Sequence, residues 1–124
     1  MKISTLVDKE IIITGASGFI GSHLLKYLIS KKLKVTGYYR NYSERFEKLG
    51  INGNVINIDS YNQIPSGNNK VLIHLAQESN IQNSEFINNN SSDINLTKSL
   101  VNKNFFFMYI FLALLFMAIN AKIH

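Results

Sequence analysis

Three glycines spaced three residues apart follow a short apolar segment near the amino end of the chain. The segment Glu10–Thr14 contains three isoleucines and runs straight into Gly15, Gly18 and Gly21. Glycine at the first position permits a sharp turn with positive φ, and at the second it lets an anion approach the N–H groups at the positive end of a helix. At the third it lets that helix pack tightly on the strand. Strand, glycine turn and amphipathic helix in this order predict a site for a dinucleotide pyrophosphate.

Apolar runs alternate with segments of helical periodicity along most of the chain. We predict strands over residues 10–14, 33–39, 55–58, 71–76 and 105–110, and helices over 18–30, 44–49 and 92–103. The strands lie too far apart in the sequence for hairpins, which implies parallel pairing through right-handed crossovers. We therefore expect an α/β protein with a partial Rossmann fold, a doubly wound parallel sheet of about five strands.

The first predicted helix carries one apolar face, which we expect to be buried. This face comprises Ile20, Leu24, Leu25 and Leu28. Ser22, His23 and Lys26 are expected elsewhere on the helix, and His23 is interpreted as solvent-facing. His74 lies inside an apolar strand, and we expect it to be a hydrogen-bonded core histidine.

Length, charge and cysteine content narrow the possible classes of protein. A chain of 124 residues holds one domain at most, and without cysteine it has neither disulfides nor thiolate chemistry. The net charge of +5 comes from scattered Lys and Arg, which indicates a solvated surface and no nucleic-acid partner. No His, Asp and Glu residues have the spacing of metal ligands, so no metal is expected. Residues 1–10 lack the apolar core of a signal peptide, which favours a cytoplasmic location.

Two of these motifs resemble those of a known family. Thr14–Gly21, TGASGFIG, is similar to the first turn of the NAD-dependent epimerase/dehydratase family, the extended short-chain dehydrogenases/reductases, and Val71–Ala76, VLIHLA, is similar to its fourth strand. Val35–Asn41 and Val55–Asp59 fit its second and third strands more loosely, and Asn89 falls where the family has an Asn in its next helix. The resemblance covers residues 9–110 and implies the amino-terminal half of a Rossmann domain that binds NAD or NADP.

The resemblance also implies a cofactor site made of the glycine turn and the residues that follow the strands. The expected cofactor-binding residues are Gly15, Ser17, Gly18, Phe19, Ile20, Gly21, Arg40, Asp59, Ser60, Leu75, Ala76 and Asn89. NAD-specific members place an acid after the second strand, whereas this chain has Arg40 there. A guanidinium at this point pairs with a 2′-phosphate and favours NADP, unless Arg40 is an ordinary surface residue. Asp59 is interpreted either as an adenine contact or as an ordinary acid at a strand end.

The family's chemistry depends on a Tyr-x-x-x-Lys pair and a nearby Ser or Thr, which move a proton. We expect none of the six tyrosines to belong to such a pair. No catalytic residues are therefore predicted, and it stays open whether the chain is an enzyme. The resemblance implies that an intact relative acts on a nucleotide sugar, whereas this chain is expected to bind the cofactor at most.

The apolar run over residues 105–119 departs from the family's pattern after Ile110. We therefore expect an NAD(P)-binding half-domain over residues 1–110 and an aberrant apolar tail over residues 111–124. Three interpretations of the tail stay open: a short membrane anchor, a buried strand and helix, or a shifted reading frame. A frame shift at Ile110 with permitted codons restores Ile-Ser-Ser-Ala-Phe-Val-Tyr-Gly-Asp, which is similar to the family's motif at this point.

These interpretations lead to two hypotheses about function. In the first, the chain is a truncated member of the epimerase/dehydratase family. In the alternative, it is a non-catalytic NAD(P)-binding protein that is anchored to a membrane through residues 105–119.

Overall fold

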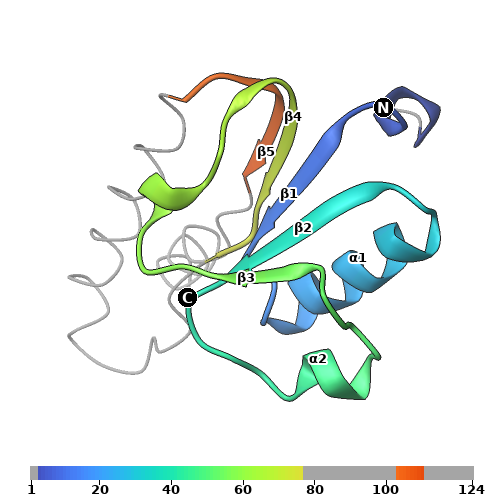
Figure 1. Cartoon of the computed structure of the whole chain (residues 1–124), viewed down its shortest axis with the longest axis vertical. Helices are drawn as coiled ribbons and strands as arrows, with labels where there is room; N and C mark the ends of the chain where they lie inside the picture. Colours follow the sequence, from blue (N-terminus) through green and yellow to red (C-terminus); the bar gives the residue numbers. More distant parts are fainter. Residues whose placement is uncertain (1–2, 77–102, 111–124) are drawn as a thin grey trace, which may run out of the picture.

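Five parallel strands form one sheet in the computed structural model, which describes residues 3–76 and 103–110 (Figure 1). The strands are β1 (Glu10–Thr14), β2 (Lys34–Tyr39), β3 (Val55–Asn57), β4 (Gly67–His74) and β5 (Phe105–Ile110), in the order β3-β2-β1-β4-β5. The other described elements are α1 (Phe19–Ser30), α2 (Arg45–Lys48) and two short 3₁₀ turns, η1 (Ile3–Leu6) and η2 (Tyr61–Gln63). The predicted α/β fold with a partial Rossmann sheet is confirmed. The helix predicted over 92–103 lies outside the described residues.

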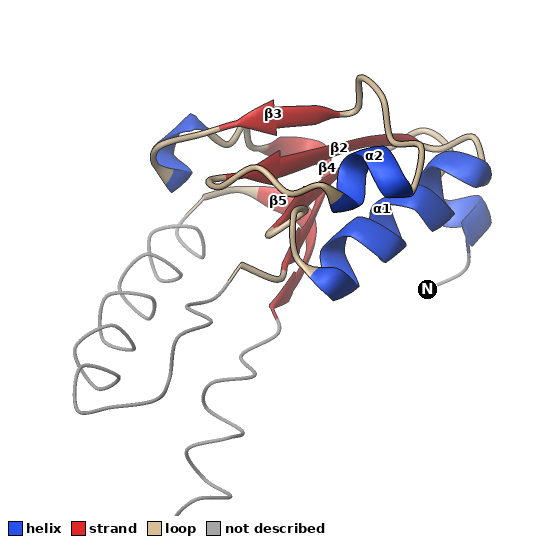
Figure 2. Ribbon diagram, turned by 90° about the horizontal axis from the view of Figure 1, so that it is seen from below, coloured by secondary structure: helices blue, strands red, loops and turns tan. Residues whose placement is uncertain are grey.

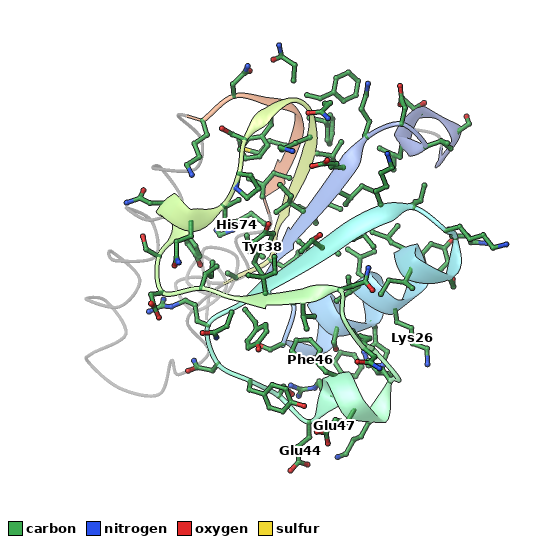
Figure 3. The ribbon with its side chains drawn as sticks, viewed as in Figure 1. Lys26, Tyr38, Glu44, Phe46, Glu47 and His74 are labelled. Carbon is green, nitrogen blue, oxygen red and sulfur yellow. The ribbon has the colours of Figure 1, made fainter. Side chains whose placement is uncertain are left out.

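Both helices pack on the same face of the sheet (Figure 2). All residues of β1 after Glu10 are buried, because this central strand is covered on both faces. The core beneath the helices comprises Ile11, Ile13, Ala16, Leu25, Leu28, Leu33, Val35, Phe46, Ile51 and Val71. Phe46 points from α2 toward the sheet, whereas Glu44 and Glu47 point away from it (Figure 3).

The opposite face of the sheet is packed by the segment that follows β3. One buried cluster on this face comprises Ile12, Tyr38, Ile58, Tyr61, Ile64 and Leu72. At the amino end of the same face, Lys70 pairs with the Glu10 carboxylate across neighbouring strands and holds the pKa of that carboxyl below its usual value. The Lys103 ammonium donates to the carbonyl oxygens of residues 61, 62 and 64 at 3.1, 3.3 and 2.7 Å, which ties the start of β5 to this segment.

Most predicted element bounds agree with the structure to within one or two residues, and β4 differs most. It spans Gly67–His74, whereas we predicted residues 71–76. Its first part is polar and shifts register against β5 between Gly67 and Val71, so no apolar pattern marks it as a strand. The second predicted helix is also shorter than expected. The Ser43 hydroxyl accepts the N–H of Arg45 at 3.2 Å, and α2 makes a single turn.

The buried face of α1 differs from the predicted one at two positions. Ile20 is 57% exposed, whereas Ser22, which we placed away from the core, is fully buried. The residues that face inward are Gly21, Ser22, Leu25 and Leu28, because the close approach of Gly21 to the preceding turn sets the rotation of the helix. Ser22 is tolerated in the core because its hydroxyl donates to the carbonyl oxygen of Phe19 at 3.2 Å.

β5 confirms the strand predicted over residues 105–110 and pairs in parallel with β4. The strand consists of the first part of the apolar run over residues 105–119, and the rest of the run, residues 111–119, follows the strand in the sequence. The tail over residues 111–124 lies outside the described residues. Within residues 3–76 and 103–110, no helix is both long enough and apolar enough to cross a membrane.

Gly37 lets α1 lie directly against β2, a role that no sequence pattern indicated. A Cβ atom at Gly37 would lie 2.6 Å from Ala16 Cβ and 2.8 Å from Leu25 Cδ2. Both neighbours are fully buried. A side chain at this position would therefore push the helix away from the sheet.

We expect Gly37→Ala to lower the free energy of unfolding by about 1–3 kcal/mol, because overpacking a filled core forces backbone shifts. Urea denaturation followed by circular dichroism measures this change. Gly67→Ala is the matched control, because a Cβ there would lie 3.3 Å or more from the movable ends of Asn69 and Lys70. Equal effects of the two substitutions would show that the contact between α1 and β2 does not depend on Gly37.

Candidate functional site

The glycine turn joins the carboxyl ends of three neighbouring strands. Gly15 follows β1 with a φ of 70°, and the N–H of Ala16 donates to the carbonyl oxygen of Tyr38 in β2 at 3.2 Å. On the other side, a Cβ atom at Gly15 would lie 2.7 Å from the backbone nitrogen of Ala76 and 2.8 Å from the carbonyl carbon of Leu75. The structure therefore brings Gly15 together with Leu75 and Ala76, and no residue larger than glycine fits between the two segments.

The amino end of α1 lies at the surface immediately after this turn. Gly18 is the N-terminal cap of the helix, and no side chain caps it. The first N–H groups of an α-helix have no partner within the helix, and they carry the positive end of its dipole. Phe19 and Ile20 flank them and are 65% and 57% exposed. A negatively charged group can therefore approach the backbone here.

Gly18 and Gly21 differ in what a side chain would meet. At Gly18, a Cβ atom would approach only the carbonyl oxygen of Gly15, at 3.3 Å, and the residue is exposed. At Gly21, a Cβ atom would lie 2.1 Å from that same oxygen. Gly21 is thus required for the fold, whereas the fold tolerates a side chain at Gly18.

A buried polar network links the ends of β1 and β4 beneath the turn. Thr14 Oγ1 and His74 Nδ1 lie 2.5 Å apart, and both side chains are buried. The N–H groups of Leu75 and Ala76 approach the same hydroxyl oxygen at 3.1 and 3.3 Å. The predicted hydrogen-bonded core histidine is thereby confirmed at His74. Burial lowers the pKa of this imidazole from 6.5 to about 4, so the ring is neutral at pH 7.

The residues expected at the adenosine end lie beyond the carboxyl ends of β2 and β3. Arg40 is exposed and follows Tyr39, the last residue of β2. The Asn57 side-chain amide donates to the carbonyl oxygens of Tyr39 and Arg40 at 3.2 and 3.1 Å, which joins the ends of the two strands. Asp59 is exposed at the same edge of the sheet.

Ser60 has a structural role that its sequence context did not indicate. Its hydroxyl accepts the N–H of Asn62 at 3.2 Å and caps η2, while the side-chain oxygen of Gln63 accepts the N–H groups of Asp59 and Ser60 at 2.6 and 3.0 Å. These bonds fix the backbone that follows β3 and hold Asp59 at the edge of the sheet.

Arg45 lies beside the glycine turn and was missed from the sequence. Its guanidinium donates to the carbonyl oxygen of Ser17 at 3.2 Å, although Arg45 belongs to α2. No motif marks this contact, because the two residues meet only when α2 folds back over the turn. With Arg40, it places two exposed guanidinium groups on the connection that follows β2.

One expectation about the catalytic pair requires correction. The spacing Tyr-x-x-x-Lys does occur, at Tyr27 and Lys31, although we expected no tyrosine to belong to such a pair. Both residues are exposed at the carboxyl end of α1, with the ammonium of Lys31 5.3 Å from the centre of the Tyr27 ring. Tyr27 lies about 12 Å along the helix axis from the end that faces the glycine turn, so this pair does not contact the candidate cofactor site.

The remaining site predictions concern a histidine, a metal and Asn89. His23 is exposed, as expected, and its Nδ1–H donates to the carbonyl oxygen of Phe19 at 2.8 Å. Among the described residues, no group of His, Cys, Asp and Glu could hold a metal ion. Asn89 lies outside the described residues.

The lowered pKa of His74 makes the stability of the fold depend on pH. Between pH 6.5 and about 4 the unfolded chain binds a proton at this histidine and the folded chain does not. The free energy of unfolding should therefore fall as the pH is lowered through this range, by at most about 3 kcal/mol. Denaturant titrations at pH 7.5, 5.5 and 4 measure the loss.

Two variants test whether His74 causes this loss. His74→Asn removes the titrating ring and should abolish most of the loss between pH 6.5 and 4. The exposed His23→Gln variant should retain it. A wild-type protein whose stability is flat over this range would contradict the assignment.

The comparisons with known proteins agree with this geometry. One family model, described as the NAD dependent epimerase/dehydratase family, matches residues 11–102. The match includes the glycine turn, β2, β3 and β4, and the family depends on a nicotinamide dinucleotide. No curated protein matches the chain. Since the family model spans most of the sequence and the sheet has the expected parallel order, the chain belongs to the NAD-dependent epimerase/dehydratase family.

Proposed function

We propose that this chain binds NADP in preference to NAD and is the cofactor-binding half of an epimerase/dehydratase. The proposal is carried by the uncapped amino end of α1 beside the glycine turn. There, Gly18 is exposed and lets a phosphate approach the backbone. Gly15 and Gly21 allow the close backbone contacts that form the surrounding turn. No other described residues offer this combination of free helix donors and absent side chains.

The residues present fit a dinucleotide. Gly18 and the first residues of α1 would hold the pyrophosphate, and Leu75 and Ala76 would lie beneath the cofactor. Arg40 and Asp59 would hold its adenosine end. When bound, the nicotinamide supplies hydride transfer, whereas the residues named here bind and orient the cofactor. His74 takes no part as an acid, because burial keeps it neutral.

The preference for NADP follows from the charge on the connection after β2. Arg40 occupies the place where NAD-specific proteins of this fold carry an acid. A guanidinium there pairs with a 2′-phosphate through two charge-assisted hydrogen bonds. Arg45 adds a second positive charge on the same connection, where it contacts the glycine turn.

The substrate class is proposed from the family resemblance, because fold does not determine substrate. In this proposal, residues 1–110 form the NAD(P)-binding half-domain, and an intact relative would act on a nucleotide sugar. The tail over residues 111–124 would follow from a shifted reading frame at Ile110. Sequencing the coding DNA beyond Ile110 tests the frame shift. The frame-shift proposal fails if the shifted frame does not continue as an open reading frame that encodes a Tyr-x-x-x-Lys motif.

The membrane-anchored alternative makes a different prediction for the same chain. A specific anchor should leave folded protein in the membrane fraction, whereas a frame-shifted tail should lead to aggregation or degradation. The assignment of Phe105–Ile110 to β5 favours the first proposal, because a spanning helix needs about 20 apolar residues.

We expect Gly18→Val to weaken NADP binding by at least about tenfold, a loss of about 1.4 kcal/mol or more. The added side chain would cover the N–H groups at the start of α1, while a Cβ at this position meets only the Gly15 carbonyl oxygen at 3.3 Å. Isothermal titration calorimetry measures the affinity, and circular dichroism checks that the variant folds. Gly67→Val, which lies at the start of β4, is the control. Unchanged affinity in a folded Gly18→Val protein would remove the glycine turn from the site.

We expect Arg40→Asp to reverse the cofactor preference from NADP to NAD, because the carboxylate repels a 2′-phosphate and accepts hydrogen bonds from ribose hydroxyls. The ratio of the two dissociation constants measures the preference. Lys34→Asp is the matched control, since it makes the same change of charge at the opposite end of β2. If both variants change the ratio equally, the preference arises from net charge and Arg40 is a surface residue.

A further inference from the structure

The hydroxyl oxygen of Thr14 lies within hydrogen-bonding distance of three groups, two backbone N–H groups and one imidazole nitrogen. A threonine hydroxyl has one hydrogen to donate and two lone pairs that accept. The N–H of Ala76 points to this oxygen at 3.3 Å, and the N–H of Leu75 is shared between it, at 3.1 Å, and the Thr14 carbonyl oxygen, at 3.2 Å. Both lone pairs are therefore occupied by backbone donors from the segment that follows β4.

The third neighbour of this oxygen is the imidazole of His74. Because the lone pairs are taken, the hydroxyl hydrogen must point to His74 Nδ1, 2.5 Å away. Nδ1 then accepts and carries no hydrogen, so the ring proton is on Nε2. The opposite tautomer would direct two hydrogens at each other across the same short distance. Burial of the ring favours the neutral form that this arrangement needs.

The segment held by Thr14 forms one wall of the glycine turn. Leu75 and Ala76 are the residues that a Cβ atom at Gly15 would strike, at 2.8 and 2.7 Å. A small displacement of this segment therefore changes the space available to Gly15 and to the turn that follows it. The direction of the Thr14 hydroxyl hydrogen therefore affects the shape of the candidate cofactor site, because it determines whether the lone pairs of the oxygen face Leu75 and Ala76.

We propose that His74 is a positioning residue: its Nδ1 accepts the Thr14 hydrogen, directs the Thr14 lone pairs toward Leu75 and Ala76, and thereby sets the shape of the glycine turn. The cofactor part of this role rests on the proposed function above. The hydrogen-bond arrangement itself does not, so the two can be tested separately.

Two substitutions at His74 separate the acceptor from the ring. In His74→Asn, the side-chain oxygen lies the same number of bonds from the backbone as Nδ1 and can accept the Thr14 hydrogen. In His74→Phe, the ring remains and the acceptor is lost. Thr14→Val removes the hydroxyl at nearly constant volume. Leu72→Ala is the stability control, because it leaves a cavity two residues earlier on β4, on the same face of the sheet, and removes none of the hydrogen-bonding groups of the network.

The first measurement needs no cofactor. Nuclear magnetic resonance of the full chain should show a hydrogen on Nε2 of His74 and none on Nδ1. Hydrogen exchange at the Leu75 and Ala76 amides should become about tenfold faster or more in His74→Phe and in Thr14→Val, relative to the amides of β4. It should stay near the wild-type rate in His74→Asn and change only in proportion to global stability in Leu72→Ala. A hydrogen on Nδ1, or unchanged exchange in His74→Phe, would overturn the proposal.

The second measurement is the affinity for NADP, corrected for the folded fraction. We expect His74→Phe to lower it several-fold and His74→Asn to restore it, whereas Leu72→Ala should leave the affinity of the folded protein unchanged. Equal losses in His74→Phe and Leu72→Ala would reduce His74 to a core residue. If the wild-type chain binds no NADP, the proposed function fails and the cofactor role of His74 fails with it. The tautomer and the exchange rates still decide the hydrogen-bond arrangement in that case.

Discussion

The close approach of α1 to the end of β1 is the constraint on which the rest of the structure depends. The Gly15 carbonyl oxygen occupies the space that a side chain at Gly21 would need, since a Cβ atom there would lie 2.1 Å away. This contact directs the first turn of the helix toward the carboxyl edge of the sheet and fixes which residues of α1 face inward. Gly37 likewise has no side chain, which lets the same helix lie directly against β2. The candidate anion site and the helix layer therefore arise from the same packing.

The parts of the structure that could be predicted are those with a local signal. Strands β1, β2, β3 and β5 are apolar runs bounded by turn residues, and the glycine turn is marked by its spacing. The first part of β4 could not be predicted in this way, because Gly67–Lys70 is polar and is held in the sheet by its neighbours. The predicted inward face of α1 was wrong at two positions, Ile20 and Ser22, for a related reason. Hydrophobicity favours burying Ile20, whereas the contact at Gly21 rotates Ser22 into the core.

The candidate site, too, has some residues that a local sequence motif predicts and others that no local signal marks. Gly15, Gly18, Leu75 and Ala76 follow from motifs, and the structure places them together. Arg45 and the pairing of Thr14 with His74 depend on residues that are 28 and 60 positions apart in the sequence and meet only in the folded chain. His74 was recognised as a core histidine because it lies in an apolar strand. The direction of its hydrogen bond with Thr14 follows from the two backbone N–H groups that already occupy the Thr14 oxygen.

The strand order also determines the sequence in which the site can be assembled as the chain is made. β1 is synthesised before the other four described strands, yet it lies in the centre of the sheet, with Glu10 paired to Lys34 on one side and to Lys70 on the other. The pairing with β2 closes a short loop and can form early, whereas the pairing with β4 closes a loop more than twice as long. Until β4 emerges, Thr14 exposes an unpaired hydroxyl and the glycine turn lacks one wall. The candidate cofactor site is therefore complete only once β4 has joined the sheet, so the site forms later than the pairing of β1 with β2.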